Sequence, residues 1–444
     1  MTVKDDLASY QPNTILQQLQ SISFHVTCGL TLNMDPASIT SLLLGAILGA
    51  IFGMLFPVLY KRALTAYGSQ RTRRRIDFLS SGQVTKWLLD YYRRNESHVD
   101  LFDCRLGRTE VKIPFFTKPE WQINQRVLPD RDTVVQVTVG STSNFPIKMS
   151  LVRRRSALGQ RFFGEQKTLY LDRIEDQRDF KVYAKACVFF QMATKLIELE
   201  EETFRAAGSR IARATPLRDR CLRDLPTAEK VIERPFSIGC TTALAMKRPA
   251  GFDLLIQTRS PSTMTFGGSR AVIPNFGLEP NWTDAAQSKF SIIFYNLLKE
   301  YCEELFDYEE LIDMQKLRRP SPDWFTSLPE ARELLKRLEN NTFWVEFLGF
   351  GIDGLNGTGN VALLAVVNDE AFASDLERGI KANWEVAEHS PSVEPLRFID
   401  YHDPMLAQWL SEGQLQYGSA FTIDLAVKRL DEISLTSTHG QSLR

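Results

Sequence analysis

Three glutamates in the second half of the chain, Glu300, Glu303 and Glu304, have a spacing that could hold a metal ion beside a helix. They lie in the segment Phe290–Asp307, where apolar residues recur every three or four positions and predict an amphipathic helix. At about 100° per residue, the three carboxylates line one flank of the apolar stripe, and Glu304 falls inside its edge. A buried carboxylate needs a partner, and Mg²⁺, which prefers oxygen ligands, is one candidate. The alternative is a solvated acidic face with one glutamate paired to arginine.

The composition narrows the choice of metal and partner. The chain has 444 residues, of which 43% are hydrophobic and 24% charged, as in ordinary folded proteins, and its net charge is −1. This balance gives no reason to expect duplex nucleic acid as a partner. The six cysteines have no C-x-x-C spacing and the five histidines are dispersed. A metal site here should therefore be built from carboxylates, and no cofactor other than Mg²⁺ is indicated.

An uncharged, largely apolar run over residues 39–60 is long enough to cross a hydrocarbon core of about 30 Å. Basic residues gather between positions 61 and 75, so the positive-inside rule predicts a short external N-terminus and a cytoplasmic bulk. Gly45, Gly49 and Gly53 recur one helical turn apart, a pattern that lets helices associate in lipid. The sequence thus predicts a single-pass helix in the lipid bilayer that forms a homo-oligomer.

The elements around the acidic helix predict an α+β fold. Apolar runs bounded by turn residues predict a hairpin, two further strands joined by a glycine-rich turn, and a last strand near the end of the chain. These strands are expected at Ser237–Lys247, Leu254–Arg259, Thr342–Gly351, Asn360–Asn368 and Ala420–Val427, with an earlier one at Lys148–Val152. Helical periodicity predicts helices at Gln83–Arg94 and Asp179–Ala207.

The acidic helix, preceded by a hairpin and a glycine-rich segment, resembles the second half of the Nudix box, G-x5-E-x7-R-E-U-x-E-E-x-G-U, where U is a bulky apolar residue. In this resemblance Lys299 stands for the arginine, Glu300 for the first glutamate of the half, and Glu303 with Glu304 for the metal-binding pair. Phe306 occupies the position of the glycine.

The upstream half of the box departs from the pattern. Gly277 and Glu279 are of the expected types, but the gap between Glu279 and Lys299 is much longer than the pattern has. The resemblance covers roughly residues 215–430 and implies a Nudix-like α/β/α sandwich with a mixed sheet. The arginine and lysine residues nearest in sequence to the implied pocket, and therefore its expected ligand-binding residues, are Arg259, Arg270 and Lys299.

A Nudix-like domain behind a membrane helix is similar to the transmembrane-Nudix effectors of CBASS, the bacterial antiphage systems. That similarity implies an effector in the bacterial inner membrane whose cytoplasmic domain senses a cyclic nucleotide second messenger. Its membrane helix would oligomerise and perturb the bilayer. The expected organisation is a short tail over 1–38, the transmembrane helix over 39–60, a juxtamembrane α+β region over 61–214, the Nudix-like domain over 215–430 and a flexible tail over 431–444.

Two other functions stay open from the sequence. In the first, the chain is a Mg²⁺-dependent hydrolase of nucleoside diphosphates linked to another moiety. Glu300, Glu303 and Glu304 would hold the metal, and Glu300 and Glu304 would be the catalytic residues. In the second, the domain is a non-catalytic, membrane-tethered scaffold for protein contacts.

Overall fold

A computed structural model gives the fold of the chain. It describes residues 45, 49, 53, 56, 70 and 72–441, apart from 80, 95–99, 139–144, 158, 163–165, 177–179, 212, 223–235, 283–285, 309–321 and 389–393.

The helices are α3 (Gln83–Arg94), α4 (Met149–Ala157), α5 (Phe189–Ala207), α6 (Pro216–Leu222), α7 (Ile292–Phe306), α8 (Pro329–Glu339), α9 (Glu370–Gly379), α10 (Pro404–Ser411) and α11 (Tyr417–Gln441). Short 3-10 turns lie at Pro119–Trp121 and Trp324–Ser327, and residues 72–79 are also helical. The strands are β1 (Leu101–Leu106), β2 (Thr109–Phe116), β3 (Gln125–Arg126), β4 (Val135–Thr138), β5 (Lys167–Glu175), β6 (Lys181–Val188), β7 (Phe236–Arg248), β8 (Gly251–Thr258), β9 (Arg270–Val272), β10 (Asn275–Gly277), β11 (Phe343–Asp353), β12 (Gly359–Val367) and β13 (Leu396–Asp400).

The fold is α+β with a large mixed sheet. The strands form a 13-stranded sheet with the main order β1-β2-β11-β12-β7-β5-β6-β4, and β3, β8, β9, β10 and β13 join this path at its sides. β12 is parallel to β7 and β4 is parallel to β6, whereas β11 and β12 form an antiparallel hairpin. Residues of β7, β11 and β12 are buried almost throughout, as expected for strands covered on both faces.

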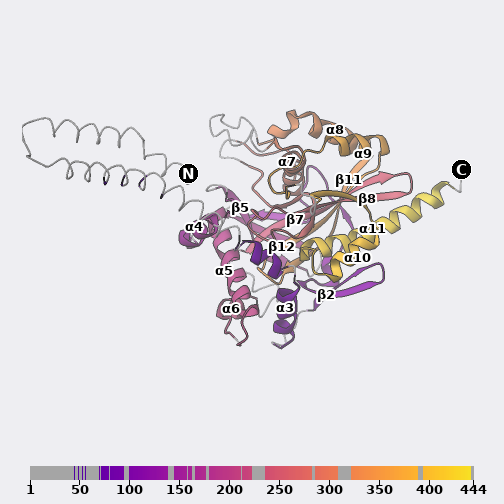
Figure 1. Ribbon diagram of the computed structural model, residues 1–444. Coiled ribbons are helices and arrows are strands. Elements are labelled where there is room, and N and C mark those ends of the chain that lie inside the picture. The colour runs from indigo at the N-terminus through magenta and orange to yellow at the C-terminus, as the bar shows by residue number, and fades with distance from the viewer. Residues whose placement is uncertain are drawn as a thin grey trace, which may run out of the picture.

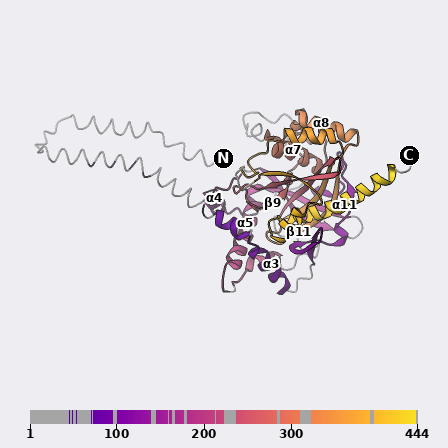
Figure 2. The same cartoon turned by 45° about the vertical axis from the view of Figure 1, so that its right-hand side comes forward.

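Helices cover both faces of the central strands. In Figures 1 and 2, α7 and α8 lie on one side of the strands and α11 lies on the other. The side chains of β7 agree with this arrangement, because Thr241 Oγ1 lies 2.5 Å from Thr422 Oγ1 of α11. The preceding Cys240 faces α7 instead, and burial, reinforced by Glu300, raises the pKa of its thiol. Successive side chains of a strand point to opposite faces, so the two helices enclose the sheet between them.

The predicted membrane helix is contradicted. Within the part of the chain that the structure describes, no helix combines the length and the apolar character needed to cross a membrane. This finding contradicts the transmembrane helix in the predicted fold class. It also contradicts the predicted location as a single-pass protein of the bacterial inner membrane. Of residues 39–60, only Gly45, Gly49, Gly53 and Phe56 are described, all of them helical, and the rest of that prediction lies outside the described residues. A Cβ atom added at any of the three glycines would meet no atom within 4 Å.

Local periodicity succeeded for some elements and failed for others. The helix predicted at Gln83–Arg94 is confirmed with the same ends as α3. The predicted helix Asp179–Ala207 is wrong in its first part, since β6 precedes α5. The predicted strand Lys148–Val152 lies mostly in α4.

The last predicted strand, Ala420–Val427, is also wrong, because these residues belong to α11. Its β-branched and aromatic residues favour a strand, but contacts with other elements favour the helix. Asp424 is fully buried, accepts a hydrogen bond from the Arg105 backbone N–H at 3.0 Å, and pairs with Lys428, one helical turn later, at 2.6 Å. A strand would separate Asp424 from Lys428, so this pair needs the helix.

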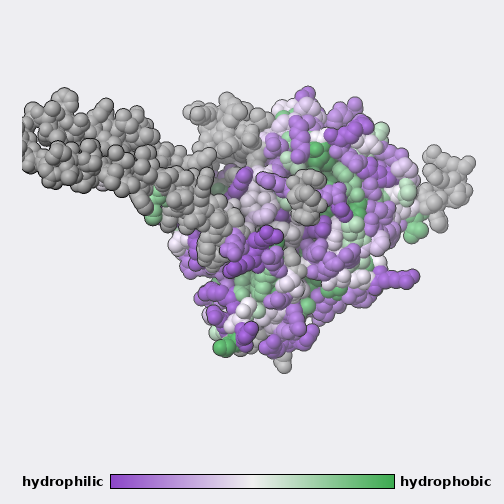
Figure 3. Space-filling model, in the orientation of Figure 1, coloured by the Kyte–Doolittle hydropathy of each residue, from purple (hydrophilic) through white to green (hydrophobic). Residues whose placement is uncertain are grey.

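The face of the molecule shown in Figure 3 is mainly hydrophilic, with hydrophobic side chains in smaller groups among the polar ones. This surface agrees with a charged fraction of 24%. The apolar residues of the described chain are concentrated instead between the sheet and its helices.

Candidate functional site

The predicted acidic helix is α7, and it is enclosed on nearly all sides. Its first turn is capped by Ser291, whose Oγ accepts a hydrogen bond from the Phe294 N–H at 3.4 Å and donates one to the Leu128 carbonyl at 2.9 Å. It ends at Asp307, which has a left-handed φ of 59°. Apart from Glu300, every residue of α7 is buried. Charged residues on this helix therefore lie inside the protein and need partners there.

Lys299 is the partner of three carboxylates. Its Nζ lies 3.0 Å from Glu279 Oε2, 3.2 Å from Glu300 Oε1 and 3.4 Å from Glu303 Oε2, and its side chain is only 5% exposed. Burial would lower the pKa of Lys299, but the three carboxylates outweigh burial and raise it. The ammonium group is therefore charged and forms the centre of an acidic cluster, which we define as Glu279, Lys299, Glu300 and Glu303.

Glu304 lies beside this cluster and has a different environment. Its Oε2 accepts a hydrogen bond from the Asn275 backbone N–H at 3.1 Å, and the residue is 2% exposed. Burial is the main cause that raises the pKa of Glu304 to about 8, and the neighbouring Glu385 raises it further, whereas Arg259 lowers it. Near neutral pH, the Glu304 carboxyl is thus mostly protonated and adds little negative charge to the site.

The cluster and Glu304 form one wall of a cavity of about 680 Å³, a size typical of small-molecule sites. The ionisable residues that line it are more often acidic than basic. Its acidic residues are Glu279, Glu300, Glu303, Glu304, Asp307, Asp353 and Glu385, and its basic residues are Arg161, Lys167, Arg259 and Lys299. An anionic ligand would enter this cavity more readily with a divalent cation than alone.

Apolar and aromatic side chains form another part of the lining. Phe189 and Met192 come from α5, and Phe276 comes from β10. Trp384 lies in the segment after α9, and the guanidinium of Arg161 is placed 5.0 Å from the centre of its ring. A flat aromatic group on a ligand could stack against such side chains.

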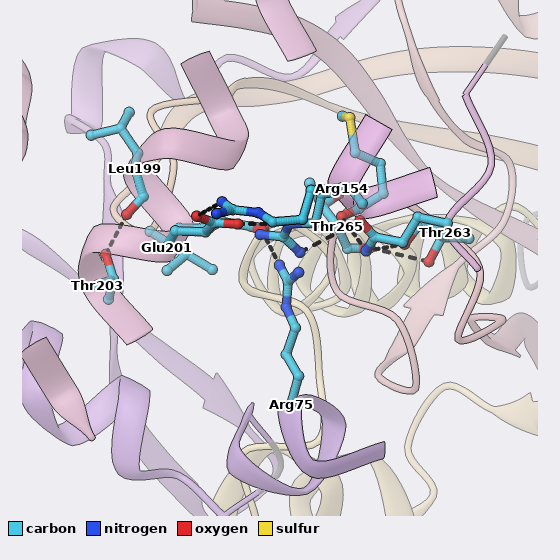
Figure 4. A network of polar contacts seen from close by, with 12 residues as sticks. Arg75, Arg154, Leu199, Glu201, Thr203, Thr263 and Thr265 are labelled. Atoms are coloured by element: carbon cyan, nitrogen blue, oxygen red, sulfur yellow. Dashed lines mark hydrogen bonds and ion pairs between the residues drawn. The ribbon is translucent and has the colours of Figure 1, made fainter. Parts of the chain in front are cut away.

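The loop between β8 and β9, residues 259–269, contributes Thr263, Met264 and Phe266 to the cavity. Gln160 fixes this loop, because its Nε2 donates to the carbonyls of Thr263 and Met264, each at 3.1 Å. Behind Gln160, the guanidinium of Arg155 donates to Gln160 Oε1 at 3.4 Å. The loop is thus held by a chain of hydrogen bonds that runs through Gln160 to Arg155, within the polar network drawn in Figure 4.

That chain continues to the segment that precedes α3. Arg155 Nε donates to Glu201 Oε1 of α5 at 3.1 Å, and its Nη2 lies 3.7 Å from the buried carboxylate of Glu200. Arg75, from the helical residues 72–79, pairs with the same carboxylate (Figure 4). Three parts of the chain that are far apart in sequence therefore support one wall of the cavity.

The structure brings most of the sequence-predicted site residues together. Glu300, Glu303, Glu304, Lys299 and Arg259 all line the cavity. Glu279, set apart by the long gap in the sequence pattern, is in direct contact with Lys299.

Arg270 lies elsewhere. Its Nε donates to Gln414 Oε1 at 3.1 Å, and its guanidinium stacks over the Trp409 ring at 4.0 Å from the ring centre. It does not belong to the lining of the cavity among the described residues. The lining residues that sequence reasoning missed include Arg161, Asp353, Trp384 and Glu385, and no motif in the sequence marks them.

The donor set suits magnesium, although its atoms are engaged with protein groups. In the described part of the chain, no three His, Cys, Asp or Glu side chains are placed so that they could hold a metal ion. Glu300 and Glu303 instead contact Lys299, and Glu304 accepts a hydrogen bond from Asn275. Rotation of these carboxylates toward the cavity would offer the oxygen ligands that Mg²⁺ prefers.

Comparisons of the chain with protein-family models and with curated proteins find no match. The interpretation of the site therefore depends on its own residues and geometry.

Proposed function

We propose that the chain is a Nudix-type hydrolase that acts, with Mg²⁺, on nucleoside diphosphates linked to another moiety. One observation carries this proposal, namely the convergence of Glu279, Lys299, Glu300 and Glu303 on one wall of the cavity. The long gap between Glu279 and Lys299 departs from the sequence pattern, but it does not separate these two side chains in space. The acidic excess of the lining also favours a ligand that enters together with a divalent cation.

The roles of the residues follow from their environments. Glu300, Glu303 and Glu304 would hold Mg²⁺, which supplies polarisation of a phosphoryl oxygen and activation of water. Lys299 keeps the carboxylates Glu279, Glu300 and Glu303 close together in the absence of a ligand. Glu304 must lose its proton before it can bind a cation, since burial raises its pKa to about 8.

A second candidate is a receptor of a bacterial antiphage system that binds a cyclic nucleotide and leaves it intact. A specific observation favours it, because the Lys299 ammonium already pairs with all three carboxylates of the acidic cluster without a metal ion. In this case Glu300, Glu303 and Glu304 are structural, and nucleotide binding would act through the association of like chains.

The test uses the purified full-length chain with Mg²⁺ and a panel of cyclic oligonucleotides and nucleoside diphosphate derivatives. Chromatography measures the intact nucleotide, both bound and free. Consumption of a diphosphate derivative supports the hydrolase, whereas a cyclic nucleotide that is retained and released unaltered supports the receptor. If no member of the panel is consumed or retained, both the hydrolase and the receptor are contradicted. The non-catalytic scaffold is then the function that stays open.

If a nucleotide is consumed, the Glu304→Gln variant should lower turnover by about 100-fold or more, since a lost metal ligand removes several kcal/mol of transition-state stabilisation. The control is Glu339→Gln, at the exposed end of α8, which should keep full turnover. Full activity in Glu304→Gln would exclude Glu304 from the metal site.

A further inference from the structure

Arg259 is held rigidly at the edge of the cavity, directly after β8. Its backbone N–H donates to the Ser269 carbonyl and its carbonyl accepts from the Gly268 N–H, both at 2.9 Å. It also forms an isolated antiparallel bridge with Val386, so its backbone is fixed on two sides. The residue is 8% exposed and lines the cavity.

The guanidinium of Arg259 is only partly paired. Nη2 lies 3.3 Å from Glu385 Oε2, at the long end of the hydrogen-bond range. Nε and Nη1 are buried and have no hydrogen-bond partner among the described residues. Buried charged donors are normally paired, so an arginine with two unused nitrogen atoms beside a cavity points to an acceptor that arrives from outside.

Gln257 gives a second, independent observation at the same place. It is two residues before Arg259 in an extended chain, so both side chains leave the same face of the strand. Gln257 is 1% exposed, and neither its Oε1 nor its Nε2 has a partner among the described residues. Two neighbouring buried side chains therefore have unused hydrogen-bonding capacity, and of the two Arg259 is the one that lines the cavity.

The charges around Arg259 leave room for an anion. The acidic residues of the cavity that interact with it include Glu304 and Glu385. The Glu304 carboxyl is already engaged, because its Oε2 accepts a hydrogen bond from the Asn275 backbone N–H at 3.1 Å. Glu385 is partly exposed and screened by solvent. Three other carboxylates of the lining, those of the acidic cluster, are paired with Lys299.

We propose that Arg259, with the unpaired Gln257 amide on the same face of the strand, forms a subsite for a phosphoryl group of the ligand that enters the cavity. The planar fork of a guanidinium matches two oxygen atoms of a phosphoryl group, and the buried Gln257 amide supplies a polar group next to it. This inference rests on the proposed function, because the proposed ligand is a phosphorylated compound. It adds that part of the phosphate recognition comes from an arginine directly after β8, and thus from a protein cation in addition to any metal ion.

The test measures binding of inorganic pyrophosphate to the full-length chain in the presence of a chelator, by equilibrium dialysis. We expect the wild-type chain to bind the probe and Arg259→Gln to bind it at least tenfold more weakly. Arg259→Lys, which keeps the charge but loses the fork, should lie between them, and Gln257→Leu should weaken binding severalfold. The matched control is Arg248→Gln, at the end of β7 and outside the cavity lining, which should bind like the wild type.

The proposal is overturned if the wild-type chain does not bind pyrophosphate, or if Arg259→Gln binds it as Arg248→Gln does. If Arg259→Gln does not fold, Arg259→Lys and Gln257→Leu decide the matter, and wild-type affinity in both overturns the proposal. The subsite and the proposed function can fail separately. Pyrophosphate binding that needs Arg259, with no nucleotide consumed or retained, supports the subsite and contradicts the function. Nucleotide turnover with an unchanged KM in Arg259→Gln supports the function and overturns the subsite.

Discussion

Lys299 is the residue on which the acidic cluster depends. A single buried ammonium group contacts carboxylates from Glu279, Glu300 and Glu303, so its removal leaves buried negative charges without a cation. Removing one partner of a buried ion pair costs about 3–5 kcal/mol. If the carboxylates can bind Mg²⁺, the metal should replace part of the lost positive charge.

We therefore expect Lys299→Met to lower the free energy of unfolding by about 3–5 kcal/mol, and millimolar Mg²⁺ to restore part of that loss. Urea denaturation with Mg²⁺ and with a chelator measures both effects. The exposed Lys289→Met is the control and should respond little to Mg²⁺. A Lys299→Met variant whose stability is the same with and without Mg²⁺ would contradict a metal site at these carboxylates.

Asp353, at the end of β11, makes the stability of the fold depend on pH. Burial raises the pKa of Asp353 to about 7, although hydrogen bonds from the backbone N–H groups of Leu355 and Asn356 oppose the shift. In the unfolded chain the carboxyl has a pKa of about 3.9. The folded state thus binds the proton more tightly, and this contribution to stability is present below about pH 4 and is lost as the pH rises through 7.

In the Asp353→Asn variant this loss should disappear. The free energy of unfolding of the variant, relative to the wild type, should rise between pH 5 and pH 8, by about 2.5 kcal/mol. Denaturant titrations at both pH values measure it, with the exposed Asp130→Asn as the matched control. A difference between variant and wild type that does not change with pH would show that Asp353 ionises normally in the folded protein.

At the scale of elements, the loop 259–269 shows how the cavity wall depends on a distant segment. Gly268 has a left-handed φ of 83°, and a Cβ atom there would lie 2.5 Å from Ile76 Cγ2 of the helical residues 72–79. Only glycine satisfies both conditions at low cost. The loop is therefore pressed directly onto this segment, in addition to the hydrogen bonds through Gln160.

Gly268→Ala should lower the free energy of unfolding by about 2–4 kcal/mol, from overpacking and backbone strain together. Thermal and urea denaturation measure the loss. Gly277→Ala is the control, because a Cβ atom at Gly277 would meet nothing within 4 Å. Equal stability of the two variants would mean that the loop does not pack on residues 72–79 as described.

At the scale of the whole molecule, the boundary drawn between residues 214 and 215 crosses a continuous sheet. Strand β2 pairs with β11, and β5 pairs with β7, so strands from both sides of the boundary hydrogen-bond to one another. Separating the chain at this boundary would expose the edges of β7 and β11. It would also expose residues that are now buried, such as Phe115 and Leu171.

Residues 215–430 expressed alone should therefore fail to give a cooperative unfolding transition, whereas residues 70–441 should give one. Circular dichroism during thermal denaturation, with both fragments at the same concentration, measures this. Cooperative unfolding of the shorter fragment at a similar midpoint would show that the second region is an independent domain.

The sequence by itself determined the elements whose pattern depends on near neighbours. The helix at Gln83–Arg94 and the β11–β12 hairpin were predicted because periodicity and turn residues are local properties. The acidic stripe of α7 was also visible, and with it Glu300, Glu303 and Glu304. By contrast, the predicted membrane helix is contradicted within the described residues, although composition and length favoured it.

Only the tertiary structure decided which of these residues share a site. Glu279 meets Lys299, and Arg259 meets Glu385, because β8, β10 and the segment after α9 converge on the C-terminal half of α7. Residues 420–427 are helical for a similar reason, since Asp424 is satisfied by Arg105 and Lys428 only in that form. Such contacts join residues that are far apart in the chain, and their free energy is set by burial and charge in the folded state, which local periodicity does not contain.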